Sequence, residues 1–544
     1  MHSNGPVKEC PFASFKYKTI RVFRFRPVYR RGHEILDKRR SSSSAFQHVR
    51  NRFPPQARMN FLVLTNDRYM IGSNPYLPLF EPTLDTFDKI RQSSSLLLAS
   101  ILSVASRTED GMEHLSGLFR EEANRLAGES LFDNVARPET AQALLILAAW
   151  SEKSWFALSH AVNVALDLGI DSSLSTLTAE ASLPIKSLIK LGRETRTWLI
   201  IYHLEREIAF GTARKSRVAR VEEDGLRAFR HHACSRHLDV RFLSIIDLVQ
   251  LREKWQTIIE GYTNIAADAM DLVRDAKESF HAWEMNWDQQ HDDREYDMAS
   301  FQRVSLTVQR NYATILVYCE ILSELQRQKS GGSRVVLDAF HQLSRETLIS
   351  ATDHLQFITS TSSFKWQLKF SPTYSALTIA FSAALALTLA KTHPTISHER
   401  SLVAIIQEIS SILAEYPNQK FHRLVESFLK RTSVRSTSSR PQPEQKTATT
   451  TTQGPNPTQS TSTHRRHVDD FSQTTDTTSL NLHSGQNPGC APTISAFANT
   501  ASLFSPPDMT FPHDKELEAI LGLPAESWFL DPFSLEGFSF DGGA

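Results

Sequence analysis

The chain is 544 residues long and carries 60 basic and 60 acidic residues, so its formal net charge is zero. Only 20 residues are glycine, about half of the usual ~7%, which disfavours a sheet fold with many tight turns. The cysteines lie too far apart for a local metal site or a secretory disulfide framework, which favours a reducing intracellular compartment: Cys10, Cys234, Cys319 and Cys490.

Residues 1–60 are predicted to form a basic, poorly patterned arm, with 14 Lys or Arg residues against Glu9, Glu34 and Asp37. The stretch FKYKTIRVFRFRP is typical of a short strand or of a basic arm that contacts nucleic acid. A solvated or misannotated leader is favoured over a folded DNA-binding module. The N-terminus lacks the apolar stretch of a secretory signal, but its arginine content leaves a mitochondrial presequence open. A candidate nuclear-import cluster comprises Arg30, Arg31, Lys38, Arg39 and Arg40.

Residues 61–431 are predicted to form one all-α domain. Between Glu139 and Ser371 the only proline is Pro184, so few helix breakers interrupt the apolar periodicity. Gly169 is expected to end the helix that begins near Ser154. The other predicted helices are Leu96–Arg107 after the cap-like serines 93–95, Glu139–Trp150, Arg241–Tyr262, Ala266–Trp287, Phe301–Gln328, Val335–Ile358, Pro372–Thr392 and His398–Leu413.

The most informative segment is RTWLIIYHLEREIAFGTAR, which runs from Arg196 to Arg214. From the residues alone, Trp198 is expected to lie in the core and Glu205 with Arg206 to form a structural polar pair. Three segments that precede it in order are Leu98–Arg107, Glu139–Trp150 and Ser154–Gly169. Together these segments resemble the regulatory domain of fungal zinc-cluster transcription factors.

The resemblance covers roughly residues 96–218. In its signature helix, Trp198, Tyr202, Glu205, Gly211 and Arg214 stand where the family has tryptophan, tyrosine, aspartate, glycine and arginine, and Arg206 follows the acidic position. Ala213 and Lys215 depart from the family's glycine and proline, which puts the local turn in doubt more than the fold. The resemblance implies a nuclear transcription regulator that controls a metabolic or biosynthetic gene set in a fungus.

The family's DNA-binding cluster, six cysteines in two close triplets that bind two zinc ions, has no counterpart in this chain. Cys10 has no second cysteine within two hundred residues. Three explanations stay open: the protein acts through a DNA-binding partner, residues 1–60 contact promoter DNA directly in another way, or an N-terminal exon is missing from the sequence.

Two short patterns suggest other chemistry. Asp292 and Asp293 begin the metal motif of terpene synthases, but Tyr296 occupies a position where that motif needs an acid. The segment HHACSRH, residues 231–237, contains donors for zinc or copper, yet the flanking arginines favour a solvated basic loop. We therefore predict no catalytic residue, no cofactor and no metal site, and a protein that is not an enzyme.

The segment SPTYSALTIAFSAALALTLA, residues 371–390, has no charge and is about as long as the ~20 residues that span a bilayer. It is only mildly hydrophobic and lacks an aromatic belt. We therefore expect a helix buried inside the α-domain and no association with a membrane.

Residues 432–505 are rich in Ser, Thr, Pro and Gln and are predicted to be a disordered linker. Residues 506–544 combine eight acidic residues with aromatic ones, which is typical of an acidic activation segment that docks into coactivator grooves. A disordered end with chance aromatics, or a segment that folds back on the core, is the alternative. The predicted anchors are Leu517, Ile520, Leu521, Trp528, Phe529, Phe533 and Phe538.

The leading hypothesis is a nuclear transcription regulator, an activator whose helical domain acts as a sensor or as a platform for homo- or heterodimerisation. The second hypothesis is an interaction protein that does not bind DNA and sequesters a related transcription factor. The activity of the isolated tail distinguishes the two, because a sequestering protein needs no activation segment.

Overall fold

The computed structural model describes residues 55–109, 111–132, 135–151, 154–179, 183–211, 215–328, 333–392 and 399–438. The chain divides into two compact units, Met1–Arg58 and Met59–Ala544, and nearly all of the described residues belong to the second unit. Every regular element in the described ranges is a helix, so the fold is all-α, as predicted from the sequence.

The described ranges contain seventeen α-helices, a short π-helix and a short 3-10 helix. In chain order these are α3 (Pro55–Arg68), the π-helix (Tyr69–Ser73), α4 (Phe87–Ser93), α5 (Ser95–Ser106), α6 (Glu113–Ser130), α7 (Pro138–Trp150), α8 (Ser154–Asp167), the 3-10 helix (Ile170–Ser172), α9 (Ser173–Ala179), α10 (Ile185–Gly211), α11 (Glu223–His231), α12 (Asp239–Glu260), α13 (Ala269–Asp292), α14 (Phe301–Gln328), α15 (Arg334–Ser360), α16 (Ser362–Leu368), α17 (Thr373–Thr392), α18 (Glu399–Ala414) and α19 (Lys420–Ser438).

Local signals in the sequence set several helix ends. The Ser94 hydroxyl accepts a hydrogen bond from the Leu97 backbone N–H (3.1 Å) and caps α5, within the predicted serine run. Gly169 adopts φ +67°, the left-handed conformation that glycine tolerates best, just beyond α8. Both predicted signals are confirmed, because each depends only on residues close in sequence.

Other boundaries differ from the prediction. The signature helix α10 begins at Ile185, eleven residues before Arg196, and α13 begins later and ends later than the predicted helix. Helix α3 starts inside the predicted N-terminal arm, and α19 continues to Ser438, inside the predicted linker. Helix ends that fall in polar or weakly periodic stretches are thus the least well predicted by local pattern.

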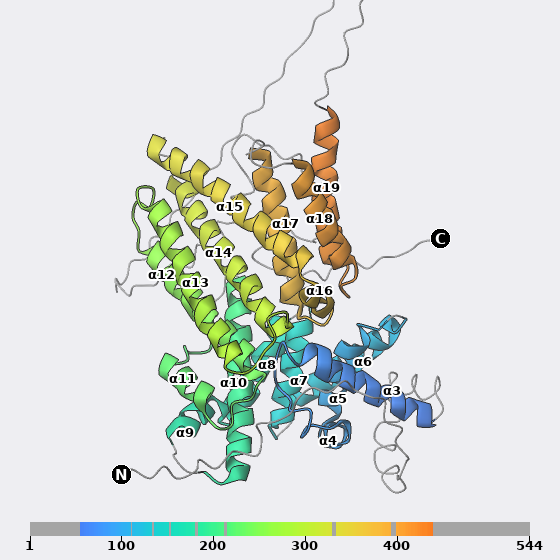
Figure 1. The fold of residues 1–544 in the computed structure, drawn as a ribbon. Coiled ribbons are helices and arrows are strands. Elements are labelled where there is room, and N and C mark those ends of the chain that lie inside the picture. The colour runs from blue at the N-terminus through green and yellow to red at the C-terminus, as the bar shows by residue number, and fades with distance from the viewer. Residues whose placement is uncertain are drawn as a thin grey trace, which may run out of the picture. The chain divides into compact units, whose positions relative to one another are not determined.

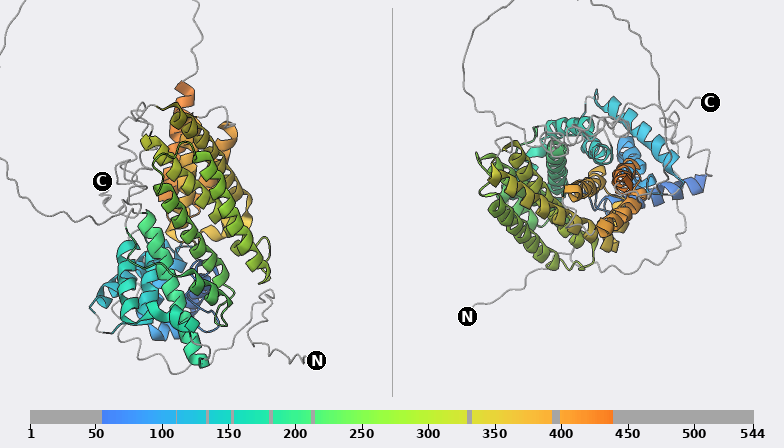
Figure 2. Two further views of the ribbon diagram at one scale, coloured as in Figure 1. Left: turned by 90° about the vertical axis from the view of Figure 1, so that its left-hand side faces the viewer. Right: turned by 90° about the horizontal axis from the view of Figure 1, so that it is seen from above.

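Consecutive helices form packed pairs, and the most extensive contacts join α5 to α6, α7 to α8 and α14 to α15. Figure 1 shows α12 to α15 running beside one another, with α17, α18 and α19 next to them. In the left panel of Figure 2, the blue-to-teal helices gather at one end and the olive-to-orange helices at the other. Helix α10 contacts α7, α8, α9 and α12, and therefore joins helices that precede it in the sequence to one that follows it.

Helix α17 is the segment with the composition of a membrane span. Its window Thr373–Ala390 has a mean hydropathy of 1.6, and by length and composition alone it could cross a bilayer. In this fold it packs against α15, α18 and α19, and none of its residues from 373 to 390 is exposed. This arrangement agrees with the predicted core helix, because the apolar surface is covered by protein.

The π-helix packs tightly against the turn between α16 and α17. A Cβ atom built on Gly72 would lie 2.3 Å from the Phe370 ring, so glycine is required for this approach. The Phe370 carbonyl accepts hydrogen bonds from Trp150 Nε1 (3.1 Å) and from the Ser73 hydroxyl (3.2 Å). The turn is therefore held from two sides by residues some 220 and 297 positions away.

We expect Gly72→Ala to lower the free energy of unfolding by about 1–3 kcal/mol, because the new methyl group displaces a buried aromatic ring. Urea unfolding measures the change. The matched control is Gly117→Ala in the second turn of α6, where an added Cβ meets nothing within 4 Å. That control is expected to stabilise the protein by about 0.5–1 kcal/mol, and equal effects of the two substitutions would contradict the packing argument.

Candidate functional site: the buried ion pairs of helix α10

Helix α10 carries three charged side chains that are buried in the fold. The side chains of Arg196, Glu205 and Glu207 have exposed fractions of only 4%, 0% and 6%. Charged residues are almost never buried unless they are paired. Each of these three has a partner of opposite charge on a different segment, and together they attach α10 to its surroundings.

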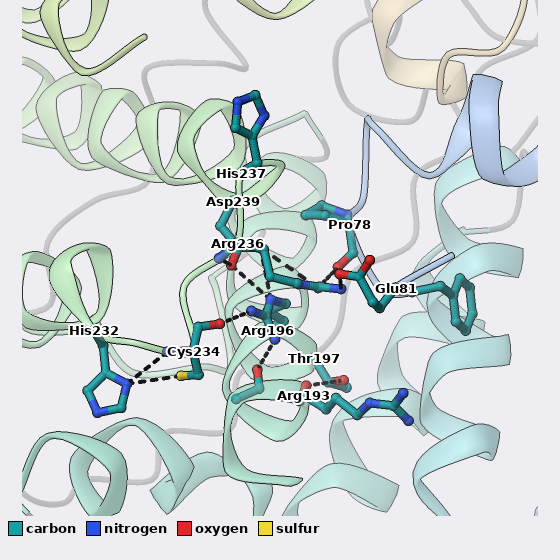
Figure 3. Close-up of polar contacts among 12 residues, drawn as sticks. Pro78, Glu81, Arg193, Arg196, Thr197, His232, Cys234, Arg236, His237 and Asp239 are labelled. Carbon is teal, nitrogen blue, oxygen red and sulfur yellow. Dashed lines mark hydrogen bonds and ion pairs between the residues drawn. The ribbon is translucent and has the colours of Figure 1, made fainter. Parts of the chain in front are cut away.

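Arg196 forms the first attachment, shown in Figure 3. Its Nε lies 2.9 Å from both carboxylate oxygens of Asp239, the first residue of α12. Its Nη1 donates to the Gly192 carbonyl (2.8 Å), and its Nη2 donates to the Cys234 carbonyl. With Asp239 only 1% exposed, this is a buried, fully hydrogen-bonded ion pair that joins α10 to α12.

The HHACSRH segment is packed against this ion pair. The Arg236 backbone N–H donates to Asp239 (2.7 Å), while the Arg236 guanidinium donates to the Pro78 carbonyl (2.7 Å) and lies 3.4 Å from Glu81. The His232 Nδ1 lies 3.1 Å from Cys234 Sγ. The expectation of a solvated loop is therefore wrong for Arg236, whose side chain is only 16% exposed, because its guanidinium finds acceptors on the segment before α4.

Cys234 is not prepared as a nucleophile. Burial raises the pKa of its thiol above the ordinary value, with the nearby Arg196 opposing the shift and Asp239 adding to it. Within the described ranges, no group of three or more His, Cys, Asp or Glu side chains is arranged to hold a metal ion. Asp292, from the incomplete terpene-synthase pattern, forms an ion pair with Arg303.

Glu205 forms the second attachment, to the irregular segment that follows α10. It accepts hydrogen bonds from Arg217 at the backbone N–H (2.8 Å), Nε (2.8 Å) and Nη2 (2.7 Å). The Arg217 guanidinium also lies 4.0 Å from the centroid of the Trp155 ring on α8. A single arginine thus connects α8, α10 and this segment, residues 215–221, which we call the strap.

The neighbouring signature residues hold the same strap. Arg206 donates to the Val218 carbonyl (3.0 Å) and pairs with Glu253 of α12 (2.9 Å). Gln250 of α12 donates to the Val221 carbonyl (2.7 Å) and lies 3.4 Å from the Tyr202 hydroxyl. Glu205 and Arg206 therefore do not pair with each other as predicted; consecutive residues point to different sides of a helix, and each meets a different partner.

The remaining signature residues have lesser roles. Trp198 is half-buried, so it lies at the margin of the core and not at its centre. Gly211 is the last residue of α10. Arg214 lies outside the described residues, as do the import cluster and all of the predicted activation anchors.

Glu207 forms the third attachment, a buried ion pair with Arg252 of α12 (2.7 Å). The oppositely charged partners in these three ion pairs are not predicted from the sequence. They are Asp239, Arg217 and Arg252. They lie 43, 12 and 45 residues from their partners on α10, and no local spacing connects them. The acids Glu205 and Glu207, which lie between apolar residues in the stretch LEREIAF, are the sequence signal for distant cationic partners.

Glu320 on α14 is a further buried acid. Its Oε2 atom has no hydrogen-bond partner. Burial raises the pKa of Glu320 to about 8, with Arg252 opposing the shift. The folded state therefore holds a proton that the unfolded chain releases near its ordinary pKa of 4.5. The contribution of Glu320 to the free energy of unfolding is therefore expected to fall as the pH rises from about 4.5 to about 8.

We expect Glu320→Gln to remove this pH dependence. The variant and the wild type should have similar stability near pH 4, and the variant should become more stable by on the order of 2–4 kcal/mol at pH 8. Urea unfolding across this range measures the difference. Glu278→Gln, on the exposed face of α13, is the control that should leave the profile unchanged. Parallel profiles for wild type and Glu320→Gln would show that Glu320 ionises normally.

No family model matches this chain, and neither a curated protein nor a solved structure matches it. The resemblance to the fungal regulatory domain therefore depends on the residues quoted for it.

Proposed function

We propose that this protein is a nuclear transcription regulator that activates a metabolic or biosynthetic gene set. The helical domain is the platform, and the acidic, aromatic residues 506–544 recruit coactivators. The platform reaches promoter DNA through a DNA-binding partner or through its basic N-terminal arm. The proposed function includes no catalytic activity.

The observation that carries the proposal is the way the segments of the resemblance come together. They correspond to α5, α7, α8 and α10, which are separated in sequence. Helix α7 contacts α5, α8 and α10, and α10 also contacts α8. Segments that resemble one domain thus form one packed unit, which is what a shared regulatory domain requires. The charge asymmetry between the basic N-terminal and acidic C-terminal regions of the sequence supports the proposal further.

The direct test fuses residues 506–544 to a heterologous DNA-binding domain and measures a reporter gene. Activation is expected, and replacing Trp528, Phe529, Phe533 and Phe538 with alanine should reduce it to the level of the DNA-binding domain alone, because grooves of coactivators bind apolar anchors. The matched control replaces Ser527, Ser534 and Ser539 with alanine and should keep the activity. A tail that activates nothing would contradict the activator function.

A second measurement separates promoter action from sequestration. The epitope-tagged full chain should give discrete chromatin peaks at promoters in its native host. A nuclear protein without peaks, combined with an inactive tail, would instead indicate sequestration of a related transcription factor. Peaks that disappear when residues 1–54 are deleted would assign DNA contact to the basic arm.

A further inference from the structure

The strap contains a serine that is surrounded by cations. Ser216 is half-buried between Lys215 and Arg217, and Arg220 follows four residues later. All three basic residues are exposed. The strap is irregular chain between α10 and α11, so it can become extended without unfolding a helix. A hydroxyl flanked by cations in such a segment has the charge pattern that protein kinases with acidic substrate grooves recognise.

The Ser216 hydroxyl takes part in the attachment of the strap to α10. It donates to the Val218 carbonyl (3.3 Å) and accepts from the Val218 backbone N–H (3.4 Å). The same carbonyl accepts from Arg206 Nη2 of α10 (3.0 Å). Two donors thus meet at one oxygen of a residue that is only 4% exposed. A chemical change at the Ser216 hydroxyl therefore acts directly on the contact between the strap and the helix.

The buried Glu205 makes the strap sensitive to added negative charge. Its side chain is 0% exposed, and its Oε1 accepts from the backbone N–H of Arg217, the residue that follows Ser216 (2.8 Å). A phosphate on Ser216 would carry up to about two negative charges near neutral pH. It would repel both Glu205 and the Val218 carbonyl, and it would compete with Glu205 for the guanidinium of Arg217. Added phosphate therefore weakens the closed strap.

We propose that Ser216 is a phosphorylation site for a serine kinase that selects basic sequences, and that its phosphate holds the strap open. The Ser216 hydroxyl oxygen attacks the γ-phosphorus of Mg-ATP and the bond to the β,γ-bridging oxygen breaks, so that ADP leaves and the hydroxyl proton passes to a base of the kinase. Because Ser216 is half-buried, the kinase acts on the strap after Arg217 has left Glu205. The proposal is independent of the transcriptional function, since it is tested on the purified chain.

The first experiment incubates the purified full chain with Mg-ATP and the catalytic subunit of cyclic-AMP-dependent protein kinase, and maps phosphate by mass spectrometry. Serines 41–44, which follow the basic run KRR, are the internal reference. Phosphate is expected on the reference serines and on Ser216. Glu205→Ala, which releases the strap, should raise the rate at Ser216 about tenfold relative to the reference, because the rate follows the population of the open strap. Glu223→Ala should leave the ratio unchanged.

Hydrogen exchange measures what the phosphate does to the strap. The backbone amides of Arg217 and Val218 are expected to exchange about fivefold faster once Ser216 is phosphorylated. Kinase-treated Ser216→Ala, which keeps phosphate on the reference serines, should exchange like untreated Ser216→Ala. Ser216→Asp should reproduce part of the acceleration. Ala219→Asp is its matched control, because it adds the same charge at an exposed position of the strap, and it should leave the exchange unchanged.

A second variant tests opening without removing a buried charge. Ser159→Ala removes a hydroxyl on α8 that accepts from Arg217 Nη1, and it should raise the rate at Ser216 about twofold. The proposal is overturned if the reference serines are phosphorylated while Ser216 is not, in the wild type and in Glu205→Ala. It is also overturned if neither Glu205→Ala nor Ser159→Ala changes the rate at Ser216, or if the phosphorylated strap exchanges like the unmodified one.

Discussion

Replacing Asp239 with alanine is expected to lower the free energy of unfolding by about 3–5 kcal/mol, the usual cost of removing one partner from a buried ion pair. Asp239 accepts from Arg196 through both carboxylate oxygens and from the Arg236 backbone N–H. Without it, the guanidinium of Arg196 is left with an uncompensated charge at 4% exposure. Urea or thermal unfolding followed by circular dichroism measures the loss.

Two controls separate this effect from a general sensitivity of the helices. The double substitution Arg196→Met with Asp239→Leu should recover most of the lost stability, because apolar pairs of similar volume often replace buried ion pairs well. Asp338→Ala removes an exposed pair with Arg334, whose side chains are 73% and 93% exposed, and should leave the unfolding midpoint unchanged. If Asp239→Ala behaves like Asp338→Ala, the Arg196–Asp239 pair does not hold α10 to α12.

Glu205→Ala is expected to release the strap. The substitution removes three hydrogen bonds from Arg217, and we expect a loss of about 2–3 kcal/mol, less than for Asp239 because Arg217 remains 35% exposed. The strap contains three trypsin sites, Lys215, Arg217 and Arg220. Limited proteolysis should therefore cut Glu205→Ala at these sites well before the wild type, since cleavage requires local opening.

The matched control for the strap is Glu223→Ala, which removes the exposed pair between Arg220 and Glu223 at 3.0 Å. It should leave the rate of tryptic cleavage unchanged. Arg217→Lys should behave almost like Glu205→Ala, because lysine cannot reproduce the fork of hydrogen bonds or the stacking on Trp155. Equal cleavage of Glu205→Ala and Glu223→Ala would show that the strap is held by other contacts.

The signature residues of α10 are expected to stabilise the fold of this chain. Tyr202, Glu205 and Arg206 contact the strap and α12, and their substitution should act on stability first. A change in reporter activity caused by such a variant should therefore follow the amount of folded protein. Substitutions in the predicted activation anchors should instead reduce activity at constant protein level.

The sequence by itself determined the fold class and many of the helices. Helix α14 has the predicted bounds Phe301–Gln328, and the ends of α5 and α8 follow from Ser94 and Gly169. Apolar periodicity, caps and glycine stops act over one or two turns, so they can be read from neighbouring residues. The first eleven residues of α10 are not predicted, because more than half of the stretch Ile185–Thr195 is polar.

Only the tertiary structure determines which charged residues form ion pairs with one another. Nothing within a few residues of Arg196, Glu205 or Glu207 indicates Asp239, Arg217 or Arg252, because each pair is closed by a chain path of 12 to 45 residues. The same holds for Glu320, whose pKa is raised because the folded chain buries its carboxyl group. A buried charge or a buried polar atom depends on the field and the partners that distant segments supply, and local spacing does not contain that information.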